Sequence, residues 1–219
     1  MRTWTSFAVA ALLLGGAASA SADVIYNLST GLDASYTLET PGDSVDAHWT
    51  YNDPYISPSV GSALVVTPFN ADWYGGWLAN GPNSDWIAPD PDTVDNGPAP
   101  YSFSTTFDLT GYDLSTVSLS ASWAVDDYGT VDLNGIQIAS LNSGNWGGLT
   151  PVSVSTGSAD FVQGVNTLTI TITADDQFLE AVRLEGSVSG DPAVPEPASW
   201  ALAGLGALAL GAIRRRLKA

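Results

Sequence analysis

The sequence predicts an all-β domain, a two-sheet antiparallel sandwich of the jelly-roll type, and three observations support this prediction. Apolar and polar residues alternate with a period of two over most of residues 23–190, which is typical of strands with one buried and one solvated face. This region shows no helical apolar stripe. Clusters of Gly, Pro, Asn and Asp separate about nine or ten short alternating segments, the punctuation typical of a sandwich.

Two segments show the alternation most clearly. Residues 115–123 (STVSLSASW) and 166–173 (NTLTITIT) alternate apolar residues with serine or threonine, so both are predicted to be half-buried antiparallel strands. Further strands are predicted at 24–28, 35–39, 47–51, 63–67, 101–107, 152–155 and 181–188.

Residues 130–138 (TVDLNGIQI) predict a hairpin. Asn134-Gly135 is the preferred dipeptide for a two-residue turn that needs positive φ at both central positions. The alternation of side chains then predicts a register with three opposed pairs: Leu133–Ile136, Asp132–Gln137 and Val131–Ile138.

The two ends of the chain read as targeting segments. Arg2, an apolar run at 7–14 and the small residues Ala20-Ser21-Ala22 predict a signal peptide over 1–22, cleaved before Asp23. At the other end, residues 198–213 contain no charge and would span ~24 Å as a helix, somewhat less than the ~30 Å hydrocarbon core. We expect a transmembrane helix there, with a basic cytoplasmic tail at 214–219 and a proline-rich stalk at 191–197.

Basic and acidic residues lie in different parts of the chain. The sequence has 6 Lys and Arg against 23 Asp and Glu, but five of the six basic residues lie in the targeting ends. Arg183 is therefore the one basic residue set against 22 acids in the exported part. Because phosphate binding needs clustered basic residues, anionic lipid is a poor partner for the exported part and no nucleic-acid partner is expected. The absence of cysteine excludes thiol catalysis and zinc–thiolate sites.

The C-terminal region resembles the PEP-CTERM sorting signal in three parts: Val194-Pro195-Glu196-Pro197, the apolar segment 198–213, and the cluster Arg214, Arg215 and Arg216. The resemblance implies a Gram-negative bacterium in which signal peptidase removes the leader and an exosortase recognises and cleaves near the Pro-Glu-Pro. The protein would be anchored in the inner membrane until processing. It would then reach the cell surface or an exopolysaccharide matrix.

Residues 23–190 are also similar to galactose-binding-like jelly rolls, many of which bind sugars. The matching segments are 46–49 (DAHW), 76–77 (GW), 84–87 (SDWI), 104–109 (STTFDL), 123–127 (WAVDD), 134–135 (NG) and 164–168 (GVNTL).

Aromatic residues in Gly/Asn-rich loops are the candidate ligand contacts. Sugar recognition uses flat aromatic faces, with polar groups for the hydroxyls. Alternatively, these rings plug the end of the sandwich. Arg183 either pairs with neighbouring acids or contacts a sugar. The candidate ligand-binding residues are Trp73, Tyr74, Trp77, Trp86, Trp146 and Arg183.

Two acidic pairs follow predicted strands, Asp126-Asp127 and Asp175-Asp176. Calcium prefers six to eight oxygen ligands, so these carboxylates are candidate ligands of a structural calcium ion, the one cofactor that the sequence suggests. Neither pair has the spacing of an EF-hand loop. The alternative is solvated loop charge.

The sequence contains one histidine, His48, and no Gly-x-Ser-x-Gly motif, so no catalytic residue is assigned. We expect a non-enzymatic, carbohydrate-binding-like surface or matrix protein. The alternative is a structural matrix or adhesin component with no small-molecule ligand. A secreted glycoside hydrolase is a third, less favoured reading.

Overall fold

The computed structural model describes residues 22–42, 44–66, 76–90, 100–174 and 180–193. The predicted signal peptide up to Ser21, stalk residues 194–197, the apolar segment 198–213 and the basic tail lie outside the described residues. So do Trp73, Tyr74, Asp175 and Asp176. A search for membrane-spanning helices, confined to the described residues, finds none of sufficient length and hydropathy.

The described residues form eleven strands. Their bounds are β1 Asp23–Asn27, β2 Val45–Asn52, β3 Val60–Val65, β4 Ile87–Ala88, β5 Tyr101–Asp108, β6 Ser118–Asp126, β7 Tyr128–Leu133, β8 Ile136–Leu141, β9 Thr150–Val154, β10 Val165–Ala174 and β11 Ala181–Gly190.

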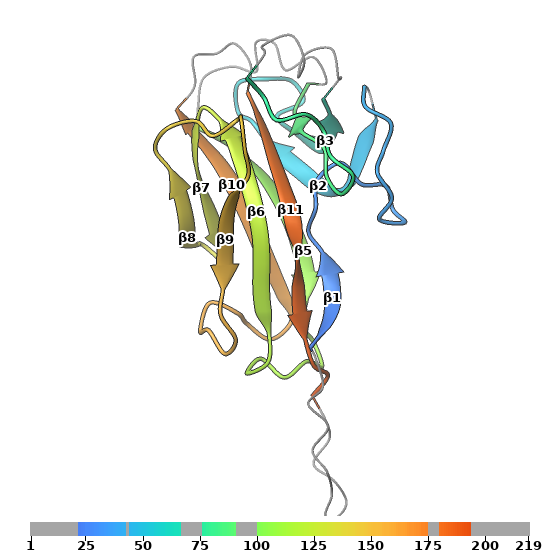
Figure 1. Cartoon of the computed structure of the whole chain (residues 1–219), viewed down its shortest axis with the longest axis vertical. Helices are drawn as coiled ribbons and strands as arrows, with labels where there is room; N and C mark the ends of the chain where they lie inside the picture. Colours follow the sequence, from blue (N-terminus) through green and yellow to red (C-terminus); the bar gives the residue numbers. More distant parts are fainter. Residues whose placement is uncertain (1–21, 43, 67–75, 91–99, 175–179, 194–219) are drawn as a thin grey trace, which may run out of the picture.

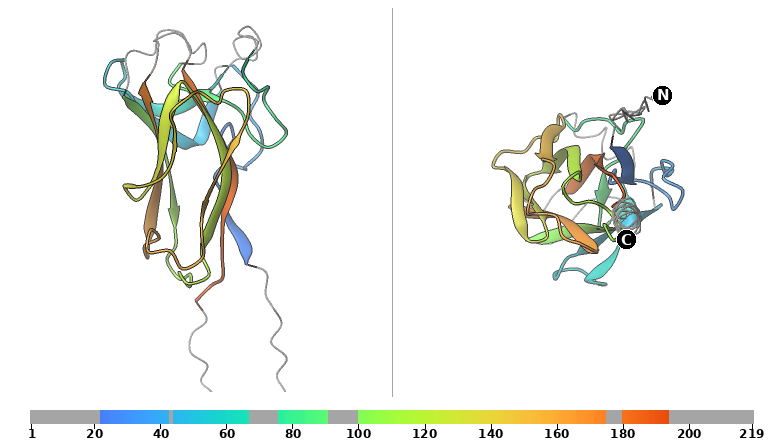
Figure 2. Two further views of the ribbon diagram at one scale, coloured as in Figure 1. Left: turned by 60° about the vertical axis from the view of Figure 1, so that its left-hand side comes forward. Right: turned by 90° about the horizontal axis from the view of Figure 1, so that it is seen from below.

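The strands form two facing sheets (Figure 1; Figure 2, left). One sheet has the order β4-β11-β6-β9, with β1 beside β11, and the other has the order β2-β5-β10-β7-β8. β3 pairs with both β2 and β4 and so joins the sheets along one side. From β4 to β11 the chain crosses repeatedly between the sheets, with only the β7–β8 hairpin staying in one. This is jelly-roll connectivity, and the predicted fold is confirmed.

The core lies between the sheets and is made by the inward half of each alternating pattern. Phe103, Trp123, Leu133 and Ile170 come from four different strands and are fully buried. The outward positions of β10 and β5 carry serine and threonine instead, with Ser104 Oγ and Thr169 Oγ1 3.0 Å apart. Burial of each large apolar side chain is worth about 1.5–3 kcal/mol, so the core fixes which face of every strand points inward.

The predicted hairpin forms, with one change of register. Asn134 and Gly135 have φ of 53° and 80°, and the pairs Leu133–Ile136 and Asp132–Gln137 are confirmed. The prediction for Val131 was wrong, because a bulge shifts the register and Val131 pairs with Ala139. The bulge adds a residue to β8, which simple alternation cannot foresee.

The strand predicted at 35–39 is instead a tight turn, closed by an isolated bridge between Leu32 and Leu38. Asp33 Oδ1 accepts the backbone N–H groups of Ser35 and Thr37, at 2.7 and 2.9 Å. A short acidic side chain thus satisfies amides that a strand would have paired with a neighbour. The two-residue strand β4 was not predicted.

The two ends of the described chain lie side by side. Asp23 pairs with Gly190 at the lower end of the sandwich (Figure 1). Beyond β11, Asp191 N–H donates to Thr116 Oγ1 at 2.9 Å, and Ala193 N–H donates to the carbonyl of Gly111 at 2.7 Å. The first three residues of the predicted stalk are therefore held against the domain.

Candidate functional site

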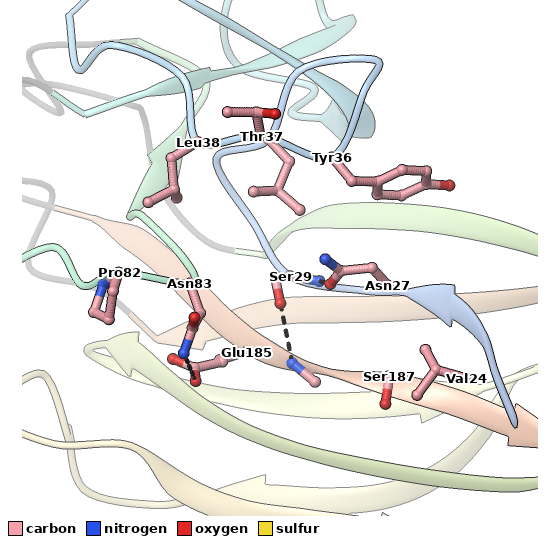
Figure 3. Close-up of a pocket in the computed structure, with 12 residues that line it drawn as sticks. Val24, Asn27, Ser29, Tyr36, Thr37, Leu38, Pro82, Asn83, Glu185 and Ser187 are labelled. Carbon is pink, nitrogen blue, oxygen red and sulfur yellow. Dashed lines mark hydrogen bonds between the residues drawn. The ribbon is translucent and has the colours of Figure 1, made fainter. Parts of the chain in front are cut away.

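A groove of about 610 Å³ lies on the outer side of β1 and β11. Its floor is formed by these two strands and its upper wall by the turn at 36–38 (Figure 3). Pro82 and Asn83 close one end. The described lining residues are Val24, Asn27, Ser29, Leu32, Tyr36, Thr37, Leu38, Pro82, Asn83, Glu185, Gly186 and Ser187.

Glu185 is the carboxylate of the groove floor. The residue is half-buried, and its Oε1 accepts a hydrogen bond from Asn83 Nδ2 at 2.7 Å (Figure 3). Its Oε2 accepts a longer one from Ser84 Oγ, at 3.4 Å. A carboxylate has about four acceptor positions, so these two bonds fix the group and leave acceptor capacity for a ligand.

Hydroxyl and amide groups continue the floor beside Glu185. The N–H of Gly186 donates to Ser29 Oγ at 3.2 Å, and the N–H of Ser29 donates to Asn27 Oδ1 at 2.9 Å. Because β11 alternates, Glu185 and Ser187 project outward while Leu184 and Val188 fill the core. The polar floor is thus the solvent face of a strand whose other face holds the sandwich together.

Tyr36 stands at the rim of the groove. It has a positive φ of 60° and is 44% exposed. Its ring stacks on His48, with centroids 4.2 Å apart and an interplanar angle of 8°. His48 Nε2 donates to the carbonyl of Asp33 at 2.8 Å, which holds the imidazole in place. The single histidine therefore supports an exposed aromatic ring.

Arg183 lies behind the groove as an internal anchor. It is 2% exposed, and its Nε and Nη1 donate to Ser84 Oγ and the carbonyl of Ala79, at 2.8 and 2.6 Å. Both acceptors belong to the segment that carries Asn83. The buried guanidinium thus binds the loop that forms the groove end, and a sugar contact by Arg183 stays a prediction.

Asp85 is buried near Arg183. Burial raises the pKa of its carboxyl group to about 6, although the nearby charge of Arg183 acts in the opposite direction. The backbone of Asp85 is bound on both sides by Thr30, whose Oγ1 donates to the Asp85 carbonyl at 2.5 Å and whose carbonyl accepts the Asp85 N–H at 2.9 Å.

Two of the tryptophans predicted as ligand contacts, Trp77 and Trp86, form a second, smaller core on the outer face of β6 and β11. Trp77 and Trp86 are 9% and 0% exposed, with ring centroids 4.5 Å apart. Trp86 Nε1 donates to the carbonyl of Leu78 at 2.7 Å, and the half-buried Trp146 packs against the cluster. Protein atoms cover the faces of Trp77 and Trp86, which favours the plugging alternative for these two residues.

Asp126, one of the predicted calcium ligands, accepts a hydrogen bond from Trp77 Nε1 at 2.6 Å. The segment that contains Asp175 and Asp176 leaves β10 at Ala174, which pairs with Tyr128. β11 then begins at Ala181, which pairs with Asp126. In the described part of the chain, no three potential metal-binding side chains gather at one point. Calcium binding by Asp126 and Asp127 stays a prediction.

Most of the groove residues were missed from the sequence. Tyr36 was assigned to a strand, and Asn27 and Ser29 carry no motif. The one available signal was Glu185, which shares a strand face with the single arginine of the exported part. A second hollow, of about 330 Å³, lies against Asn52, Tyr101, Ser102 and Thr171 and includes no charged group among its described lining residues.

Comparison with known proteins adds several distant structural likenesses. The Stig cyclase Fisc from Fischerella sp. TAU is 12% identical, with 77% of this chain and 100% of that chain covered and a TM-score of 0.43. A xylan-binding domain from CBM 22 is 12% identical over 78% and 97% of the two chains, with a TM-score of 0.39. The carbohydrate-binding module CBM36, solved with calcium and xylotriose, is 14% identical over 75% and 98%, with a TM-score of 0.29. Likenesses of this degree carry no argument about ligand or activity.

No curated protein matches the chain. The profile of the PEP-CTERM protein-sorting motif, however, matches residues 193–216. The match begins at Ala193, the last described residue of the domain, and includes all seven residues predicted to carry the sorting signal. The chain is therefore a jelly-roll protein that carries a PEP-CTERM sorting motif at its C-terminal end.

Proposed function

We propose that this protein is an exported, non-enzymatic surface or matrix component whose jelly roll binds a neutral carbohydrate in the groove beside β11. The observation that carries the proposal is the composition of the groove. An exposed aromatic ring, Tyr36, stands above a floor of hydroxyl, amide and carboxylate groups within about 610 Å³. Binding sites for small ligands have this size and combine apolar walls with a few polar groups that fix orientation.

The groove supports binding rather than glycoside hydrolysis. Most glycosidases place two carboxyl groups on either side of the scissile bond, whereas Glu185 is the one carboxylate among the described lining residues. Asn83 and Ser84 already hold that carboxylate by hydrogen bonds.

The motif marks the protein for export and exosortase processing. In our proposal, signal peptidase cleaves before Asp23 and the segment 198–213 holds the protein in the inner membrane of a Gram-negative cell. Exosortase cleavage then releases the domain to the surface or the exopolysaccharide matrix.

Replacement of Pro195, Glu196 and Pro197 by alanine tests the sorting part. We expect export to continue and the protein to accumulate in the inner-membrane fraction, because the apolar segment would no longer be removed. Fractionation with unchanged surface release would contradict the proposal.

Binding is tested with the processed protein on an array of neutral oligosaccharides. Tyr36→Ala and Asn83→Ala should each weaken binding by about tenfold, because each removes a groove contact. Tyr128→Ala is the matched control, since Tyr128 is similarly exposed (38%) but lies on β7, in the other sheet. If wild type binds no glycan, or all three variants behave alike, the alternative of a structural component without a groove ligand replaces this proposal.

A further inference from the structure

The described residues that line the groove carry negative charge only. Glu185 is the one charged residue among the described groove-lining side chains. Arg183, the nearest guanidinium, directs its Nε and Nη1 to Ser84 and Ala79 behind the groove and is 2% exposed. His48 is covered on one face by Tyr36 and donates Nε2 to a backbone carbonyl. No described basic group is therefore placed to receive an anionic ligand.

The position of Glu185 suits a cationic ligand. Its two hydrogen bonds come from neutral donors, Asn83 Nδ2 and Ser84 Oγ, so neither bond cancels the negative charge, which the buried Arg183 behind the groove offsets in part. Ser29 and Ser187 offer hydroxyl groups on the same floor. An ammonium group has three donors. It could bind the free acceptor positions of Glu185 and of these hydroxyls together.

Building on the proposed function, we propose that the groove is specific for amino sugars with a free ammonium group, such as de-N-acetylated hexosamine units. The ammonium would lie on Glu185 and a sugar face would lie against the rim at Tyr36. Charge-assisted hydrogen bonds are about twice as strong as neutral ones, and exposed ion pairs contribute about 0.2–1 kcal/mol. For a half-exposed carboxylate this ion-pair energy corresponds to a preference of about 1.4-fold to fivefold over the N-acetylated sugar.

The net negative charge of the whole domain also favours a cationic ligand. With 22 acids against Arg183, the exported part attracts polycations and repels uronic-acid polymers. This long-range attraction raises the association rate and is screened by salt within about 10 Å at 0.1 M. The contact with Glu185 is local and should persist in salt. Salt dependence thus separates the two contributions.

Titration calorimetry of the processed protein tests the inference with three oligosaccharides of equal length. They are a glucosamine oligomer with free amines, its N-acetylated counterpart, and a glucuronate-containing oligomer. We expect the free amine to bind up to about fivefold more tightly than the N-acetylated form in 0.15 M salt, and the uronate to bind most weakly. Glu185→Gln should abolish this preference, so that it weakens binding of the free amine more than binding of the N-acetylated oligomer, because glutamine keeps an acceptor for Asn83 but carries no charge.

Asp132→Asn is the matched control, since it removes one negative charge from the opposite sheet. It should keep the preference. Equal binding of the amine and the N-acetylated form, or a preference that survives in Glu185→Gln, would overturn the amino-sugar inference while the proposed carbohydrate binding stands. If the wild type binds none of the three oligomers, both proposals fall.

Discussion

Asp85 packs so tightly against Gly31 that no other residue fits at position 31. Gly31 has a φ of +81°, and a Cβ at that position would lie 2.5 Å from the Cβ of Asp85. Glycine is therefore required at position 31, both for its conformation and for space. The close contact between Gly31 and Asp85 allows Thr30 to bind the Asp85 backbone. It also brings the loop that carries Asn83 against β11. The end of the groove depends on a buried acid whose charged form is disfavoured.

The raised pKa of Asp85 predicts a loss of stability with rising pH. In the unfolded chain this carboxyl group ionises near 3.8, whereas in the folded protein it ionises near 6. Between these values the folded state binds more protons, so the free energy of unfolding should fall as the pH rises from about 4 to 6 and should then level off. Asp85→Asn should flatten this part of the curve in urea unfolding at a series of pH values.

Burial also raises the pKa values of Asp46 and Asp53, so part of the slope will remain in the variant. The difference between wild type and Asp85→Asn is the decisive quantity. Asp132→Asn serves again as the control. A variant curve parallel to that of the wild type throughout pH 4–6 would show that Asp85 has an ordinary pKa.

Among the strands, the β7–β8 hairpin gives the cleanest test of a local structure. A Cβ added at Gly135 would meet no atom within 4 Å, but φ there is +80°. Gly135→Val should therefore destabilise the domain through backbone strain alone, by about 1 kcal/mol or more. Gly148→Val is the control, because Gly148 also has open space around it but no positive φ. Equal melting temperatures of the two variants would contradict the turn geometry.

Strands and hairpin were predictable because their pattern is local. Alternation over β6 and β10 reports burial directly, and Asn134-Gly135 specifies its own backbone. The turn at 33–38 was not predictable in this way, since its residues also alternate and the choice depended on one Asp33 side chain. The groove was hidden for a related reason. Glu185 is about 150 residues from Ser29 and Tyr36 in sequence, and the pairing of β11 with β1 brings it beside them.

For the whole molecule, the excess of acids predicts a dependence on salt. Uncompensated negative charges repel one another more in the compact state than in the unfolded chain. The melting temperature of the processed protein should therefore rise with sodium chloride. Calcium chloride at matched ionic strength distinguishes screening from binding. A further rise in calcium alone, lost when Asp126 and Asp127 are both changed to asparagine, would support the predicted calcium site, whereas equal rises would exclude it.

The position of β11 in the sheet sets the order of events during export. β11 is the last strand of the domain, yet it lies between β4 and β6 and also pairs with β1, the first strand. A chain that crosses a membrane from its N-terminus therefore cannot complete this sheet until Gly190 has emerged. Gly190 lies only eight residues before the apolar segment that begins at Ala198. In the proposed export route, closure of the jelly roll and arrival of the sorting motif at the membrane would thus be nearly simultaneous, and a sorting enzyme that acts at Pro195–Pro197 would meet a domain that has only just been able to fold.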